Sequence, residues 1–262
     1  MTDESAVLLR EDRADGVTVL TLNRPAQFNS LSLALLGELQ AALDSIAAVP
    51  SIRVLVIAGA GKAFCAGHDL REMRSTPEKI FMQKLFKAMA NVCTTMQRMP
   101  QPVIARIHGV ATAAGCQLVA ACDLAVAADV ARFGTSGINV GLFCTSPGVA
   151  LSRNVGRKMA MEMLLTGGLI DAQTALARGL INRVVPADKL DEELAALVAS
   201  ITNKSPLAVG MGKRAFYEQL EMGVDAAYQL AAESMACNMM AADAAEGIDA
   251  FTEKRPPNWK GC

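Results

Sequence analysis

The fold of this chain is decided by two stretches of small residues, Phe64-Cys65-Ala66-Gly67-His68-Asp69-Leu70 and Gly109-Val110-Ala111-Thr112-Ala113-Ala114-Gly115-Cys116-Gln117-Leu118. Each follows a short apolar run, at 54–58 and at 103–107, and each leads into a helical pattern. Turns of Ala and Gly let a ligand approach the main chain closely, and a helix that starts there offers unpaired N–H donors. Two such turns on neighbouring parallel strands predict two donors aimed at one oxygen, an oxyanion hole.

The remaining pattern alternates strands with helices. Branched and apolar runs predict strands at 17–22, 54–58, 103–107 and 124–128. Helical patterns cover 33–48 after an N-cap at Ser32, 76–99, and 114–121. This order predicts an α/β fold with a parallel sheet. After Pro147, residues that typically begin or end helices recur, and strand runs are rare. We therefore expect a core over residues 1–190 and a helical segment over 191–262 that packs on the core and on neighbouring subunits, within a single domain.

Composition limits the class of protein. A chain of 262 residues that is 52% hydrophobic can bury a sizeable core. A net charge of −1 does not indicate a nucleic acid or membrane partner. Seven cysteines, with no pair at metal-ligand spacing, predict reduced thiols and no metal site. Residues 1–11 are acidic and polar and show no signal or transit pattern, so we expect a cytoplasmic protein.

A family resemblance emerges from these motifs. Phe-x-x-Gly-x-Asp, followed by Gly-x-x-x-x-x-Gly-x-x-Leu and by Cys122-Asp123, resembles the enoyl-CoA hydratase/isomerase family, the crotonase superfamily, and the similarity covers nearly the whole chain. The resemblance implies a crotonase-like (ClpP/crotonase) spiral of ββα units with a C-terminal helical oligomerisation segment. It also implies an acyl-CoA thioester as ligand, no cofactor beyond the CoA moiety, and a homotrimer or dimer of trimers.

The resemblance assigns roles to individual residues. The backbone N–H groups of His68 and Ala114 would hold the thioester oxygen. The backbone at Ala66 and Gly67 would contact the adenine of CoA, and the phosphates would face two cationic side chains, Lys62 and Arg71. We expect the acyl pocket to be walled by apolar side chains, namely Met73, Phe81, Leu85 and Phe143.

The chain departs from the family pattern at two positions. Hydratases of the family use two glutamates as general acid and base, and the matching positions here are Gln117 and Gly137. Neither residue titrates, so ordinary hydration is doubtful. Two residues could replace the glutamates: His68, because imidazole titrates near neutral pH, and Cys144, which is otherwise a small loop residue.

Three functions remain compatible with the sequence. The chain could be an acyl-CoA lyase or isomerase that needs only the oxyanion hole, for instance a decarboxylase. It could instead be an enoyl-CoA hydratase or isomerase of fatty-acid oxidation. Finally, it could be a non-catalytic acyl-CoA binding protein that kept the fold and lost the chemistry.

Overall fold

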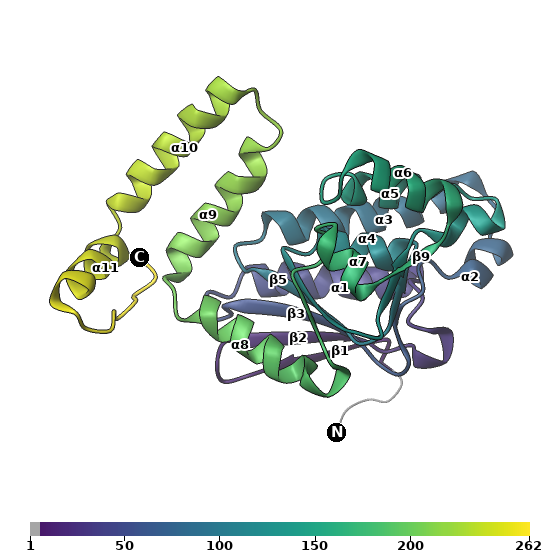
Figure 1. The fold of residues 1–262 in the computed structure, drawn as a ribbon, viewed down its shortest axis with the longest axis horizontal. Coiled ribbons are helices and arrows are strands. Elements are labelled where there is room, and N and C mark those ends of the chain that lie inside the picture. Colours follow the sequence, from purple (N-terminus) through teal and green to yellow (C-terminus); the bar gives the residue numbers. More distant parts are fainter. Residues whose placement is uncertain (1–5) are drawn as a thin grey trace.

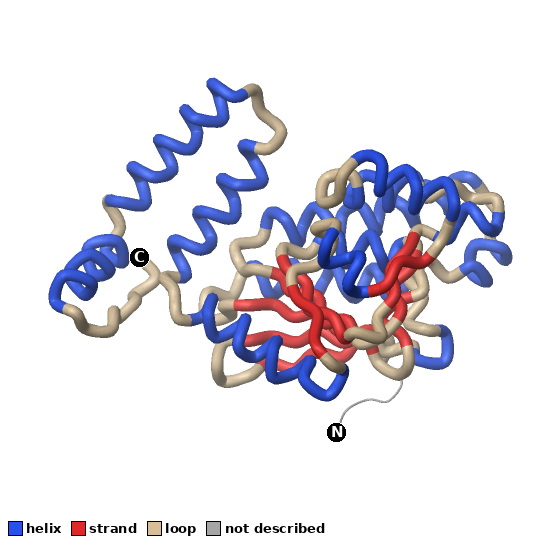
Figure 2. Tube along the Cα trace, in the orientation of Figure 1, coloured by secondary structure: helices blue, strands red, loops and turns tan. Residues whose placement is uncertain are grey.

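The computed structural model describes residues 6–262, so the first five residues of the acidic N-terminal stretch lie outside it. A six-stranded sheet has the order β1-β2-β3-β5-β7-β10. All neighbours are parallel except β1, which pairs antiparallel with β2. Figure 2 shows the strands enclosed between helices. The strands of this sheet are Leu8–Asp12, Val17–Leu22, Val54–Gly59, Val103–Ile107, Leu124–Ala128 and Arg183–Val185, in chain order.

A second sheet of four strands has the order β4-β6-β8-β9, with β9 antiparallel to β8. Its strands are β4 (Ala63–Cys65), β6 (Val110–Thr112), β8 (Arg132–Gly134) and β9 (Leu169–Asp171). The strands β3, β5 and β7 of the large sheet lead directly into β4, β6 and β8, and helical segments follow. This repeated ββα unit confirms the predicted crotonase-like α/β fold.

Helices cover both faces of the large sheet. On one face, α1, α3 and α4 bury a core that includes Leu36, Met89 and Leu118, and on the other face α8 buries Leu190 and Leu194. The helices of the chain are α1 (Leu33–Ala47), α2 (Leu70–Ser75), α3 (Lys79–Arg98), α4 (Ala114–Ala121), α5 (Thr145–Leu151), α6 (Arg157–Thr166), α7 (Ala172–Ala177), α8 (Leu190–Thr202), α9 (Pro206–Gln219), α10 (Val224–Met239) and α11 (Ala242–Glu253), with short 3-10 helices η1 (Pro25–Gln27), η2 (Ser136–Val140) and η3 (Ala187–Lys189).

The predicted strands and the helices at 33–48 and 114–121 are confirmed to within a residue, and Ser32 caps α1 as expected. The helix predicted over 76–99 is confirmed as α3, which begins at Lys79, three residues later than predicted. Thr76 and Pro77 lie in the break between α2 and α3, because Pro77 disfavours helical backbone at Thr76. The sequence pattern also missed the strands of the small sheet, which are only three residues long.

The last three helices, α9 to α11, extend away from the sheets as an arm (Figure 1). The arm is anchored at Lys213, whose ammonium lies 2.7 Å from Asp123 and donates to the carbonyls of Met96 and Gln101 at 2.6 and 2.7 Å. The Tyr217 hydroxyl donates to the same carboxylate at 2.8 Å. Within residues 6–262 no single helix is long and apolar enough to cross a membrane; Ala187–Thr202 and Pro206–Gln219 meet that length only together, bent by 98°.

Candidate active site

The first small-residue turn is held against the loop that follows β2. Leu31 donates to the Gly67 carbonyl at 2.8 Å and accepts from the Asp69 N–H at 3.2 Å, and Ala66 donates to the Phe28 carbonyl at 3.0 Å. Leu31 and His68 thus form a parallel bridge, in which the two partners of Leu31 come from the residues on either side of His68. The His68 N–H therefore points away from this loop.

Charged groups fix the same turn from the side. Arg24 donates to the Asp69 carboxylate at 2.8 Å, and these side chains are only 18% and 12% exposed. Asp69 also accepts from the N–H groups of Arg71 and Glu72, so it is the N-cap of α2. The residue after His68 is thus tied to both α2 and the preceding loop.

The second turn places Ala114 at the start of α4. Ala113 before it has φ 51° and ψ −121°, its N–H donates to the Gly134 carbonyl at 2.9 Å, and its carbonyl accepts from Gln117 at 3.1 Å. Among residues 6–262, no acceptor takes a hydrogen bond from the backbone N–H of His68 or of Ala114. Both amides are therefore available to a ligand.

The two turns touch each other at Gly67. Its backbone has φ +96°, and a Cβ built on it would lie 2.8 Å from the Ala113 Cβ and 3.2 Å from the Ala114 nitrogen. A side chain at this position would separate the turns, so glycine is required. The close approach brings the peptide that carries the His68 N–H beside the Ala114 N–H.

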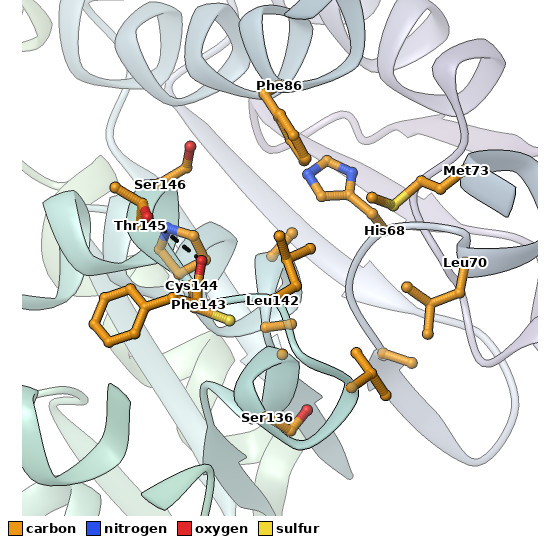
Figure 3. A pocket seen from close by; sticks show the side chains of 16 residues that line it. His68, Leu70, Met73, Phe86, Ser136, Leu142, Phe143, Cys144, Thr145 and Ser146 are labelled. Atoms are coloured by element: carbon orange, nitrogen blue, oxygen red, sulfur yellow. Dashed lines mark hydrogen bonds between the residues drawn. The ribbon is translucent and has the colours of Figure 1, made fainter. Parts of the chain in front are cut away.

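A cavity of about 350 Å³ opens beside these amides. His68 and Phe86 lie on one side of it, and Phe143 and Cys144 lie on the other (Figure 3). The described residues that line it include no Asp, Glu, Lys or Arg. The lining consists of Ala66, His68, Leu70, Met73, Phe86, Ala113, Ala114, Ser136, Gly137, Val140, Leu142, Phe143, Cys144, Thr145, Ser146 and Pro147.

His68 contributes a titratable side chain to this cavity. Its ring packs edge-on against Phe86 with 5.3 Å between centroids, and its Nδ1 is buried without a hydrogen-bond partner in the described chain. Burial lowers the pKa of His68, and the backbone of Leu31 opposes that shift. The imidazole is therefore neutral at neutral pH and can accept a proton.

Cys144 and Gly137 form the opposite wall. A Cβ built on Gly137 would lie 2.7 Å from the Cys144 Sγ and 2.5 Å from the Leu142 carbonyl oxygen. The thiol thus occupies space that a side chain at 137 would need. Burial raises the pKa of Cys144, an effect that a hydrogen bond with the Gly137 backbone reduces, so the sulfur is a thiol and a poor nucleophile.

The other predicted site residues lie further from the cavity. Gln117 is buried in α4, donates to the Cys93 sulfur at 3.6 Å, and is not part of the lining. Lys62 and Arg71 are exposed at the surface, whereas Ala66 lines the cavity and Gly67 lies behind the amides.

Two of the four residues that we expected to wall an acyl pocket line this cavity. Met73 and Phe143 line the cavity, whereas Phe81 and Leu85 do not. Phe86 takes their place because the rotation of α3, which no residue spacing fixed, turns Leu85 fully into the core. The wall contributed by η2 and the loop after it, including Val140 and Leu142, was also missed, since irregular segments carry no periodic signal.

The fold and the cavity thus define an α/β protein of repeated ββα units, with two free backbone amides beside an apolar cavity. Residues 12–262 match the family model described as Enoyl-CoA hydratase/isomerase. The chain belongs to this family.

Individual relatives agree with this assignment. The chain is 43% identical to rat enoyl-CoA hydratase domain-containing protein 3, over 94% of this chain and 82% of the relative, and 38% identical to the 2,3-dehydroadipyl-CoA hydratase of Escherichia coli strain K12, over 95% and 97%. A crystal structure of an enoyl-CoA hydratase from Mycobacterium smegmatis, 55% identical, superposes with a TM-score of 0.96 over 97% of this chain and 99% of that one. The human enoyl Coenzyme A hydratase domain-containing protein 3 is 42% identical, with a TM-score of 0.94 over 97% and 100%.

The expected cytoplasmic location is contradicted by these relatives. The enoyl-CoA hydratase domain-containing protein 3 of rat, of Xenopus laevis and of human carries the word mitochondrial in its name. The inference rested on the composition of residues 1–11 and on the reduced cysteines. The composition of residues 1–11 does not decide the location, and reduced cysteines do not distinguish one reducing compartment from another. All seven cysteines are unpaired in the structure.

Proposed function

We propose that this protein binds an acyl-CoA thioester with its carbonyl oxygen between the N–H groups of His68 and Ala114. The observation that carries the proposal is that both amides are free and lie on turns in contact at Gly67. Preorganised donors stabilise the oxyanion of an enolate, and loss of one such donor costs roughly 3–4 kcal/mol in other enzymes. The N-terminus of α4 adds a favourable dipole.

The reaction is of the lyase or isomerase type, with weak hydration of enoyl-CoA. No carboxylate lines the cavity among the described residues, and Gln117 cannot accept a proton from water. The neutral imidazole of His68 is the group that supplies proton transfer near the acyl chain. The Cys144 thiol shapes the wall and does not act as a thiolate.

A hydration assay tests this proposal. Purified protein is incubated with crotonyl-CoA, and loss of the enoyl absorbance is followed. We expect a rate at least 10²-fold below that of a two-glutamate hydratase, because each general acid–base group contributes roughly 10²–10⁴-fold. Turnover equal to that of such an enzyme would contradict the proposal and assign the acid–base role to another residue.

The acyl group is uncharged. A carboxylate at the end of the acyl chain would be buried among apolar side chains with no Lys or Arg in the described lining. Hexanoyl-CoA and adipyl-CoA have six-carbon acyl chains and differ in the terminal carboxylate. We expect hexanoyl-CoA to bind about 10-fold more tightly by calorimetry or more, since an unpaired buried charge is costly. Equal affinity would contradict this preference.

The CoA moiety extends out of the acyl cavity. Its adenine contacts the backbone at Ala66, which lines the cavity, and at Gly67, and the exposed cations Lys62 and Arg71 face its phosphates. Phosphates favour such cationic partners. Replacement of Lys62 and Arg71 together by Gln should weaken CoA binding and reduce its salt dependence, whereas replacement of Lys158, an exposed cation on α6, should change neither.

The protein assembles as a trimer or a dimer of trimers. The support is a set of large apolar side chains on the arm that are more than half exposed in one chain, namely Phe216, Leu220, Val224, Tyr228, Met235, Met239, Met240, Ile248 and Phe251. Exposed apolar surface of this extent is typical of an interface. Light scattering coupled to size exclusion should give three or six times the chain mass, and a monomer would contradict the assembly.

Non-catalytic binding is the second candidate, favoured by the absence of carboxylates from the described lining. A panel of acyl-CoA thioesters, analysed by mass spectrometry after incubation with the protein and with His68→Ala and Cys144→Ala variants, separates the two. A product that the wild type forms and a variant does not form excludes a mere binder. Tight binding without any product across the panel favours one.

A further inference from the structure

The backbone at Ala113 is strained. Its φ of 51° and ψ of −121° differ from those of Phe28 and Lys254, whose φ is also positive but whose ψ of 37° and 38° places them in the left-handed helical region. The Ala113 angles match the first central residue of a type II′ turn, a position that favours Gly. Residues held in such conformations persist only when their surroundings enforce them, and they cluster at functional sites.

Hydrogen bonds enforce the conformation on both sides of the residue. The Ala113 N–H is held by the Gly134 carbonyl on β8, and the Ala113 carbonyl is held by the Gln117 N–H one turn along α4. The second bond fixes the peptide plane that joins Ala113 to Ala114. Because the N–H of a trans peptide points opposite to its carbonyl, this bond turns the Ala114 N–H out of the helix.

The side chain of Ala113 contributes a second constraint. Its methyl lies against the Gly67 turn, at 2.8 Å from where a Cβ on Gly67 would be. Gly67 immediately precedes the first proposed donor, and Ala113 immediately precedes the second. The methyl therefore sets the spacing between the turns that carry the two amides.

We propose that Ala113 is a positioning residue, whose strained backbone and methyl aim the Ala114 N–H at the ligand oxygen and keep it at a fixed spacing from the His68 N–H. The inference rests on the proposed role of these two amides. At Ala113, stability and function therefore oppose each other. Glycine would relieve the strain and remove the methyl, which leaves the peptide restrained only by its two backbone hydrogen bonds.

The test compares Ala113→Gly with Lys254→Gly. The control relieves a positive φ at the end of α11, outside the cavity lining. Thermal unfolding should show Tm unchanged or raised by up to about 4 °C for both variants, as expected where glycine suits the backbone. A clear fall in Tm for Ala113→Gly alone would overturn the assignment of strain.

A ligand-free measurement reports the orientation of the amide. With selective ¹⁵N-alanine labelling, the Ala114 amide should give a sharp resonance in wild type and in Lys254→Gly, and should show μs–ms exchange or a displaced shift in Ala113→Gly. Ala113→Ser, which keeps a Cβ, should restore the wild-type resonance. An Ala114 resonance that is unchanged in Ala113→Gly would overturn the inference.

A ligand-bound measurement connects the geometry to polarisation of the carbonyl. The ¹³C resonance of butyryl-CoA labelled at the thioester carbonyl should move downfield when the ligand binds to wild type. With Ala113→Gly most of this shift should be lost, while the Kd for butyryl-CoA changes less than about threefold. A full shift with Ala113→Gly would overturn the positioning role. Absence of butyryl-CoA binding and shift in wild type would instead refute the proposed function, and the Ala114 resonance would still decide the role of Ala113.

Discussion

Asp69→Asn should destabilise the protein by about 2–3 kcal/mol in the free energy of unfolding. Removal of one partner of a fully buried ion pair costs roughly 3–5 kcal/mol. The Arg24–Asp69 pair is 18% and 12% exposed, and Arg24 keeps its bond to the Ser30 carbonyl, so the loss is smaller here. Asn can still cap α2, whereas Asp69→Ala should cost about 1 kcal/mol more because the cap is also lost.

A double-mutant cycle with Arg24→Met isolates the pair. Urea unfolding of both single variants and the double variant should give a coupling energy of roughly 1–2 kcal/mol. If the two losses simply add, within about 0.3 kcal/mol, the Arg24–Asp69 contact contributes nothing to the turn and the reasoning is wrong. Turnover of an acyl-CoA substrate should fall with the same variants, because Asp69 fixes the turn that carries the proposed donor, the His68 N–H.

The pH dependence of stability checks the same contact. Burial raises the pKa of Asp69, but hydrogen bonds from Arg24 and from the Glu72 N–H outweigh it, so the folded pKa lies below the ordinary 3.8. Such a carboxylate stabilises the fold fully above its unfolded pKa, and this contribution is lost as pH falls through the folded pKa. Wild type should therefore lose its advantage over Asp69→Asn below about pH 4. A constant difference down to pH 2 would refute this account.

Three further predictions concern the wall, the arm and the imidazole. Gly137→Ala should cost roughly 1–3 kcal/mol in urea unfolding, because its Cβ would meet Leu142 and Cys144; a neutral effect would show that the loop yields. Lys213→Met should cost roughly 3–5 kcal/mol and lower Tm by about 6–20 °C, since it leaves Asp123 without its cation; a loss below about 1 kcal/mol would contradict a buried pair. A reaction that uses His68 as base should rise with pH through a pKa below the ordinary 6.5, and His68→Ala should flatten the profile; equal profiles would exclude that role.

The sequence was most informative where residue type acts locally. The strand runs, the Ser32 cap and the small-residue turns follow from backbone preferences of the residues concerned, and the structure reproduces them. The strained Ala113 was not foreseen, because alanine gives no signal of a positive φ. Its conformation is imposed by Gly134 on β8 and by Gln117, contacts that exist only in the folded chain.

The identity of the residues that line the cavity could not be predicted either, because tertiary packing decides it. Leu85 and Phe86 are neighbours on α3, and only the packing of that helix decides which of them faces the cavity. Likewise, glycine at 137 stands where the family resemblance implies a glutamate, but the sequence does not reveal that Cys144 and the Leu142 carbonyl fill the space beside it.

That filled space constrains how the family can diversify from this chain. A single substitution that brings an acidic side chain to 137 meets the main chain of Leu142, which no rotamer change can move. The segment from 137 to 144 would have to shift before such a residue could be accommodated, so the substitution would cost stability. A new catalytic group in this cavity is therefore more accessible on the side of His68 than at position 137.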